Sequence, residues 1–337
     1  MVTLSEIAKK ANVSVTTVSR VVNYNDTSVC SEEMQKLIWS LVDSMGYKVK
    51  KRVNNKQEQK KPDRTFTIAY VLGTASYVMQ QSYSYAIIKG IESEAIRRGA
   101  DITFTCLNLD LYTPEMLGEK LVAASVEAVI WVAGTSEAYF EVMERLGIKI
   151  TIAGIEPGYY PEDVDYVGID FYAETLRWMK TRFVNQFERV GYIGPKELSR
   201  YQAFVDAHGI LDKPVQEEYI LELEGWTIEE AKTVMQDYMT REGKLPEAIF
   251  AACDSIALGA MTVLKSQGIQ IPDQVRVLGF DNIEMASYFV PELTTIEVPT
   301  YKIGVMAVQA ALSRLRGERD FAVRYLFPTQ YIERQSL

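Results

Sequence analysis

The sequence predicts an α/β protein in two parts, a small all-helical unit at the N-terminus and a larger core with two lobes of parallel sheet. The length of 337 residues exceeds that of a usual single domain. Residues 48–64, KVKKRVNNKQEQKKPDR, are basic, rich in amides and nearly free of large apolar side chains, which is typical of a linker. Beyond this linker, buried-type strands alternate with helical stretches in two successive series.

The N-terminal part carries a charge of the opposite sign to the rest. The formal net charge of the chain is −9. Residues 1–61 contain 11 basic and 6 acidic side chains, giving +5, and the remaining residues contain 25 basic and 39 acidic side chains, giving −14. A surface for nucleic acid is therefore expected at the N-terminus.

Cysteine usage and hydropathy predict a cytoplasmic protein with no membrane partner. Cys30, Cys106 and Cys253 are far apart and show no CxxC spacing, which argues against a disulfide framework and against a metal site. No apolar run approaches the ~18 residues of a membrane span. The opening MVTLSEIAKK has charges where a signal peptide would be apolar. No cofactor is expected.

The first element, residues 4–11, has the pattern of a short amphipathic helix. Apolar side chains recur there at i, i+3, i+4 and i+7. Thr3 and Glu6 form a capping-box pattern at its start.

A turn ending at Ser14 leads into a second helix over 15–23, and a third helix over 31–45 ends at Gly46. Two short helices joined by a tight turn, with a third packed across them, form a helix-turn-helix headpiece over residues 1–47. Its expected core is Leu4, Ile7, Ala8, Ala11, Val18, Val21, Val22, Met34, Leu37, Ile38, Leu41, Val42 and Met45.

The second helix has the composition of a DNA-reading helix. Its outward side chains are short and hydroxylated, so its backbone can approach phosphates, and Arg20 can fork onto a guanine O6/N7 pair. Val15 and Thr16, at the start, suit a thymine methyl or a base edge. A small surface helix with ordinary polar side chains is the alternative that this pattern leaves open.

The core is expected to hold a cleft at the carboxyl ends of its strands. The expected first lobe is 65–154 with 281–300, and the second is 155–280 with 301–337. Expected strands are 65–73, 102–107, 126–134, 149–154, 165–170, 189–195, 215–223, 248–253, 275–280, 293–299 and 323–327, and expected helices are 85–99, 114–124, 136–146, 172–187, 199–208, 227–242, 255–267 and 301–316.

Four stretches in this order resemble the LacI/GalR family of bacterial transcription repressors: TLSEIAKKANVSVTTVSRVVN from Thr3, DSIALGAM from Asp254, RVLGFDN from Arg276 and PELTTIEVP from Pro291. The resemblance covers nearly the whole chain. It implies a homodimer whose headpieces bind a near-palindromic operator, and a core similar to periplasmic sugar-binding proteins that closes on a small effector.

The resemblance also implies roles for headpiece residues. It places Val15, Thr16 and Arg20 at base-reading positions. It places Thr3, Ser14, Thr17, Ser19 and Asn23 at positions that contact the DNA backbone.

In the core, the resemblance places Arg200, Trp226, Asp254 and Asp281 at effector-binding positions, with Tyr83 and Ser84 as further candidates. A sugar needs carboxylates to accept, an arginine to donate in pairs and an aromatic face for its C–H side, which these residues would supply. Each also has a purely structural alternative: Asp254 as a helix cap, Asp281 as a turn residue, Trp226 as core and Arg200 as a surface ion-pair partner.

Three positions depart from the family's pattern. Gly154 stands where many relatives carry an aspartate, and Cys253 stands where an asparagine is frequent. In the linker, the segment KKRVNNKQEQKK (50–61) offers only Val53 as an apolar wedge for the minor groove, so we expect no strong central kinking of the operator.

The expected function is repression of carbohydrate-utilisation genes under control of a sugar, with galactose the first choice. Another sugar, a sugar phosphate or a purine co-repressor is the alternative within the class. A sugar-binding protein without a regulatory role is disfavoured by the basic headpiece. No catalytic residues are expected, because His208, the one histidine, is expected at a helix surface and no Ser/His/Asp set or phosphate loop occurs.

Overall fold

The structure is a computed structural model with two compact units, Met1–Asp63 and Arg64–Leu337. It describes residues 2–24, 29–47, 65–72, 82–132, 134, 137–156, 162–241 and 244–337. The expected linker 48–64, with Val53, lies outside the described residues. In the part of the chain that is described, no helix is both long and apolar enough to cross a membrane.

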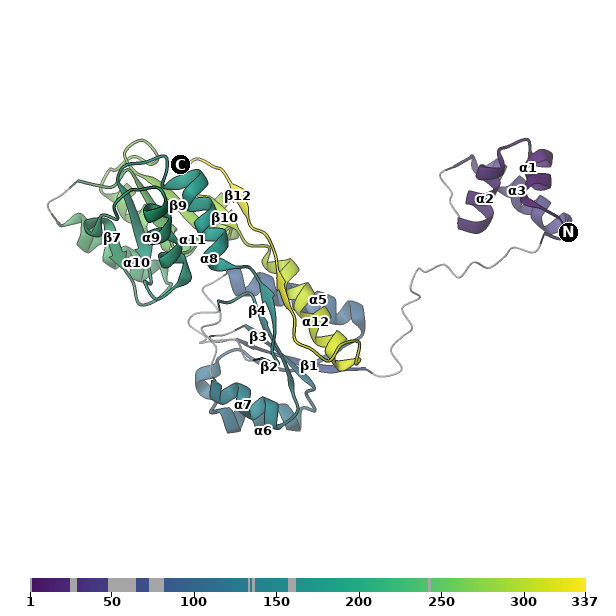
Figure 1. Cartoon of the computed structure of the whole chain (residues 1–337), viewed down its shortest axis with the longest axis horizontal. Helices are drawn as coiled ribbons and strands as arrows, with labels where there is room; N and C mark the ends of the chain where they lie inside the picture. Colours follow the sequence, from purple (N-terminus) through teal and green to yellow (C-terminus); the bar gives the residue numbers. More distant parts are fainter. Residues whose placement is uncertain are drawn as a thin grey trace. The chain divides into compact units, whose positions relative to one another are not determined.

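The N-terminal unit contains the three expected helices, α1 (Leu4–Ala11), α2 (Val15–Tyr24) and α3 (Glu32–Ser44) (Figure 1). Thr3 and Glu6 form the expected capping box: the Thr3 amide donates to Glu6 Oε2 at 2.7 Å, and Thr3 Oγ1 accepts from the Glu6 amide at 3.4 Å. Asn12 then takes a left-handed conformation, with φ of 53°, and turns the chain toward α2.

The headpiece core confirms most of the expected apolar positions. Its buried members are Ile7, Ala8, Ala11, Val18, Val21, Val22, Ile38 and Val42. Leu37 is an exception, because its side chain is 45% exposed. It precedes Ile38, which occupies the inward position of α3, and successive helical residues differ in direction by about 100°.

The first lobe of the core is built on a sheet in the order β11-β5-β4-β3-β1-β2, with every pair parallel. Alternate residues of β1 face opposite layers, with Ile68 in one cluster and Ala69 in the other. Figure 1 shows α5 and α12 along one face and α6 and α7 along the other. The elements are β1 (Thr67–Leu72), α5 (Ser82–Arg98), β2 (Asp101–Cys106), α6 (Pro114–Ala123), β3 (Ala128–Val132), α7 (Glu137–Arg145), β4 (Lys149–Ala153), β5 (Asp165–Gly168), α12 (Thr300–Leu315) and β11 (Arg324–Leu326).

The second lobe repeats this order as β12-β10-β9-β8-β6-β7, with β12 antiparallel to β10 and the other pairs parallel. In both lobes the strand order reverses beside the lobe's first strand, and ligands bind at the carboxyl edge of such sheets. The elements are α8 (Phe171–Trp178), β6 (Val190–Gly194), α9 (Ser199–Ile210), β7 (Ile220–Glu222), α10 (Ile228–Met239), β8 (Ala248–Ala251), α11 (Asp254–Ser266), β9 (Arg276–Asp281), β10 (Thr294–Glu297) and β12 (Gln330–Ile332).

The expected lobe boundaries are wrong at three places. Strand β5 pairs with β4 and so belongs to the first lobe, whereas β10 pairs with β9 and belongs to the second. Helix α12 packs against α5 in the first lobe, although 301–337 was expected in the second. The chain therefore crosses between the lobes after β5, after β10 and after β11.

A buried ion pair explains why β5 joins the first lobe. Asp165, which is 1% exposed, accepts hydrogen bonds from Arg319 Nη1 at 2.7 Å and from the Val323 amide at 2.9 Å. These donors follow α12, so they fix β5, the end of α12 and β11 together. A buried carboxylate left without such donors would be strongly destabilising.

Candidate functional site

Helix α2 presents the expected outward face. The side chains of Val15, Thr16 and Arg20 are exposed, and Val15 is 46% exposed. Ser14 Oγ accepts a hydrogen bond from the Thr17 amide at 3.0 Å and shares another with Thr17 Oγ1 at 2.8 Å. These two hydroxyls therefore anchor the start of the helix, next to the candidate base-reading residues.

The remaining headpiece candidates have mixed placements. Thr3 is exposed and caps α1, and Ser19 is partly buried in α2. The Asn23 side chain lies outside the described residues.

In the core, Arg200 is the centre of an aromatic enclosure at the start of α9. Its side chain is 6% exposed, and its guanidinium carbon lies 4.8 Å from the ring centres of Phe171 and Trp226 and 5.2 Å from that of Phe280. Arg200 Nη1 donates to the Ala252 carbonyl at 2.6 Å, while Nε has no hydrogen-bond partner among the described residues. Arg200 is therefore buried, and it is not the surface ion-pair partner of the alternative interpretation.

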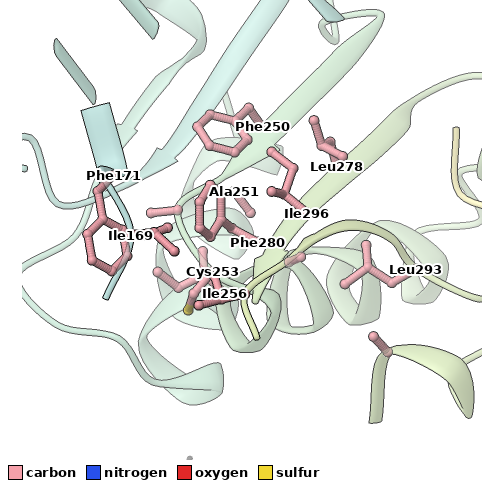
Figure 2. Packing of buried hydrophobic residues seen from close by; sticks show 14 of the residues in the cluster. Ile169, Phe171, Phe250, Ala251, Cys253, Ile256, Leu278, Phe280, Leu293 and Ile296 are labelled. Atoms are coloured by element: carbon pink, nitrogen blue, oxygen red, sulfur yellow. The ribbon is translucent and has the colours of Figure 1, made fainter. Parts of the chain in front are cut away.

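Phe171, the first residue of α8, belongs to this enclosure and lies where the chain passes from the first lobe to the second. Figure 2 shows it beside Phe280 and Ile169, with Cys253 close by. The Phe171 and Phe280 rings stack with centres 6.3 Å apart. The rings hold the guanidinium by cation–π attraction, which is strongest when water is excluded.

Asp281 ends β9 in an unusual backbone conformation. Its φ is 116° and that of Asn282 is 58°. Strained positive φ in a non-glycine residue concentrates at ligand sites and persists only where the surroundings enforce it. None of the described residues donates a hydrogen bond to the Asp281 carboxylate, so its oxygens are available. Burial raises the pKa of this carboxyl well above its usual value, while Arg200 acts in the opposite direction.

Asp254 supports this turn from the start of α11. It is 0% exposed, and its oxygens accept from Thr295 Oγ1 at 2.5 Å and from the Ile283 amide at 2.8 Å. Gly279 gives it room, because a Cβ there would lie 2.1 Å from Asp254 Oδ1. These contacts give Asp254 a structural role in the turn. Burial raises the pKa of this carboxyl to about 7.

Tyr83 joins the first lobe to the same site. Its hydroxyl donates to the Gly154 carbonyl, and burial followed by the charge of Asp281 raises the pKa of its phenol. Ser84, the next residue of α5, is partly buried and makes no side-chain hydrogen bond to another described residue. Tyr83 is therefore close enough to Arg200 and Asp281 for their charges to act on its phenol.

Gly154 cannot be replaced by the family's aspartate without a rearrangement. Its φ is +71°, and a Cβ would lie 2.3 Å from Ile87 Cδ1. At Cys253 the thiol is buried, and this burial raises its pKa.

The expectation that His208 lies at a helix surface is wrong. It is 3% exposed, its Nδ1 is 2.9 Å from the Phe204 carbonyl, and burial lowers its pKa. Its ring centre lies 4.4 Å from that of Phe204, so it is part of the core packing of α9.

The sequence analysis did not identify a contact between Glu156 and Ser199. Glu156 follows β4 in the first lobe, and its Oε1 accepts a hydrogen bond at 3.1 Å from the amide of Ser199, the first residue of α9 in the second lobe. A carboxylate two residues beyond Gly154 was the only sign of this contact in the sequence.

A helix-turn-helix unit and a two-lobed α/β core with polar groups gathered between its lobes define the architecture of a ligand-responsive transcription regulator. Known proteins agree: a model of bacterial regulatory proteins of the lacI family matches residues 3–49, and a model of periplasmic binding protein-like domains matches residues 181–337. The HTH-type transcriptional repressor MelR of Bacillus subtilis (strain 168) is 30% identical over 353 residues, covering 100% of this chain and 97% of the relative. The chain belongs to the lacI family.

Other relatives are transcription regulators of the same kind. GalR of Streptococcus thermophilus is 26% identical over 95% of this chain and 94% of its own. PurR of Vibrio parahaemolyticus is 27% identical over 94% of this chain and 92% of its own. The chain is accordingly a DNA-binding transcriptional repressor and not an enzyme.

Solved structures share the fold. The transcriptional regulator CelR in complex with cellobiose superposes with a TM-score of 0.71 at 23% identity, covering 100% of both chains. The lac repressor dimer bound to operator and the anti-inducer ONPF gives 0.69 at 19% identity, covering 99% of this chain and 98% of the other.

Proposed function

We propose that the protein represses carbohydrate-utilisation genes in the cytoplasm as a homodimer bound to a palindromic operator, and that a small neutral sugar, in the first instance galactose, controls it. Arg20, Val15 and Thr16 on α2 read base edges, with the hydroxyl side chains of the helix at the phosphates. The sugar binds between the lobes at Arg200, Asp281, Trp226 and Tyr83.

One observation carries the sugar site: Arg200 is held among three aromatic rings, near the Asp281 carboxyl, and neither Arg200 Nε nor that carboxyl has a hydrogen-bond partner among the described residues. Neighbouring sugar hydroxyls can accept from the arginine and donate to the carboxylate at once. The aromatic surface suits the C–H side of a sugar ring.

A phosphorylated sugar fits this site less well. Glu156 lies here at the start of α9, and a phosphate dianion beside its carboxylate would be repelled. A purine is the second candidate, favoured by the PurR relatives and by the flat rings of Phe171 and Trp226.

Effector control follows from a difference in effector affinity between two arrangements of the lobes. Whichever arrangement binds the sugar better is populated when the sugar is present, and the coupling between sugar and operator is reciprocal. Operator affinity measured with and without the sugar gives the sign of the coupling.

The test is a thermal-shift screen of the full chain against neutral sugars, sugar phosphates and purines. Galactose at 100 times its Kd should stabilise the protein by about 2.7 kcal/mol, a rise in Tm of roughly 5–10 °C. Arg200→Ala should abolish this rise and keep operator binding, whereas the exposed-site control Arg241→Ala should keep both. A rise with a phosphorylated sugar or a purine alone would overturn the neutral-sugar proposal.

A further inference from the structure

A carboxylate of the first lobe caps a helix of the second. Glu156 Oε1 accepts from the Ser199 amide at 3.1 Å, and Leu198, at the cap position of α9, contributes no side-chain hydrogen bond. A carboxylate at this end of a helix is favoured by the unpaired amides and by the helix dipole. Glu156 therefore lies at the start of the helix that carries Arg200.

Three buried polar atoms, on Glu156 and on the first two residues of α9, have no hydrogen-bond partner among the described residues: Glu156 Oε2, Ser199 Oγ and Arg200 Nε. Covalent geometry keeps Ser199 Oγ within about 3 Å of its own amide nitrogen. Glu156 Oε2 and Ser199 Oγ therefore both lie next to the hydrogen bond between the Ser199 amide and Glu156 Oε1. Buried polar atoms in native proteins are nearly always paired. An acceptor and two donors left unpaired together match the hydroxyls of a ligand.

Among the described residues from Lys149 to Glu156, along β4 and just after it, Glu156 is the one acidic side chain. Gly154 carries none, and the Ile87 side chain, 2.3 Å from where a Cβ would be, closes the space. The helix N-terminus already holds the Glu156 carboxylate, so a second anion there would be repelled.

We propose that Glu156 is the first-lobe acceptor of the effector site: its Oε2 binds one hydroxyl of a neutral sugar, and Ser199 Oγ and Arg200 Nε donate to neighbouring oxygens. This inference rests on the sugar site proposed above and adds to it the residue that selects hydroxyl stereochemistry. A ligand held by both Glu156 and Arg200 bridges the lobes, and Glu156 thereby links sugar identity to the lobe arrangement.

The test measures sugar binding to the full chain by calorimetry, using galactose and its single-deoxy analogues, or the equivalent series of whichever sugar raises the Tm. Glu156→Gln keeps the side-chain shape and one acceptor oxygen, and it should weaken galactose binding about 10- to 100-fold, as expected for loss of a charged hydrogen bond. The exposed Glu197→Gln changes the net charge equally, two residues before Ser199, and should leave the Kd unchanged. Ser199→Ala should weaken binding about 2- to 10-fold.

The deoxy series separates ligand contact from a structural role. In the wild type, one deoxy analogue should bind about 10- to 100-fold more weakly than galactose, and in Glu156→Gln the same analogue and galactose should bind equally. Two results would overturn the role of Glu156. One is an unchanged galactose Kd in Glu156→Gln. The other is an equal loss of affinity for galactose and all its deoxy analogues, so that the difference between them stays as in the wild type. If Arg200→Ala still loses sugar binding in that case, the sugar site stands. Absence of sugar binding to the wild type would overturn both.

Discussion

At the scale of single residues, Asp254 shows how a buried carboxyl positions a ligand-facing neighbour. It binds the Ile283 amide and the Thr295 hydroxyl, and that hydroxyl in turn accepts from the Asn282 amide at 3.3 Å. Arg334 holds the Asn282 side chain at 2.7 Å from the other side. These bonds enforce the strained turn that presents Asp281.

Asp254 also predicts a pH dependence of stability. Its carboxyl titrates near pH 3.8 in the unfolded chain and near 7 in the fold, so between these values the folded state binds more protons. The free energy of unfolding should therefore fall as pH rises, by up to about 1.4 kcal/mol per pH unit from this group. Asp254→Asn can accept from Ile283 and donate to Thr295, and it should remove this part of the slope.

Urea unfolding between pH 5 and 6.5, followed by tryptophan fluorescence, measures the slope. Asp281 titrates in the same direction, so the informative quantity is the difference between wild type and variant. The exposed Asp273→Asn serves as the control and should follow the wild type. Parallel curves for wild type and Asp254→Asn would show that Asp254 is ionised throughout this range.

Arg200 and Asp281 follow strands at the carboxyl edge, where the residues after successive strands converge. Sequence motifs that resemble the family placed both at effector-binding positions. They could not separate Asp254 from Asp281, since burial depends on Thr295 and Gly279, which are distant in sequence. Glu156 was missed for the same reason: its partner, Ser199, lies in the other lobe.

At the scale of elements, two glycines set the contact of α5 with α12. A Cβ on Gly90 would lie 2.2 Å from the Tyr301 carbonyl oxygen, and one on Gly304 would lie 2.1 Å from the Ile87 carbonyl oxygen. The helices thus cross backbone to backbone. Neighbouring carbonyls cannot move aside as a flexible side chain can.

Gly304→Ala should therefore destabilise the core by about 1–3 kcal/mol, the usual cost of overpacking. Gly209 in α9 has no atom within 4 Å of a Cβ, so Gly209→Ala should instead stabilise by about 0.5–1 kcal/mol through its helix propensity. Urea unfolding of both variants gives the comparison. Equal effects of the two substitutions would contradict the close crossing.

The sequence predicts which segments form strands and helices, but it does not predict which lobe each of them joins. The central strands of the first sheet are short apolar runs such as AVIWV in β3, because helices cover both faces of this sheet. The sheet that a strand joins depends on distant partners: Asp165 of β5 meets Arg319, 154 positions further on. Strand β12, only three residues long, shows no periodicity to detect.

At the scale of the whole molecule, the proposed binding of a dimer to a palindrome doubles the effect of each headpiece substitution. Arg20→Ala should cost about 1–3 kcal/mol per headpiece, and hence about 2–6 kcal/mol for a dimer on its operator. Fluorescence anisotropy on an operator selected from random DNA, with scrambled DNA as control, measures this. The scrambled sequence should lose far less, and an equal loss on both would show that Arg20 contacts only phosphates.

The two edge strands β11 and β12 lie within residues 324–332, and one belongs to each lobe. During synthesis, neither sheet can be completed until this short stretch has left the ribosome, whereas the headpiece has all of its helices by Ser44. At about 5–20 residues per second, the interval amounts to tens of seconds. A nascent chain therefore carries a finished DNA-reading unit well before it has a core able to respond to a metabolite.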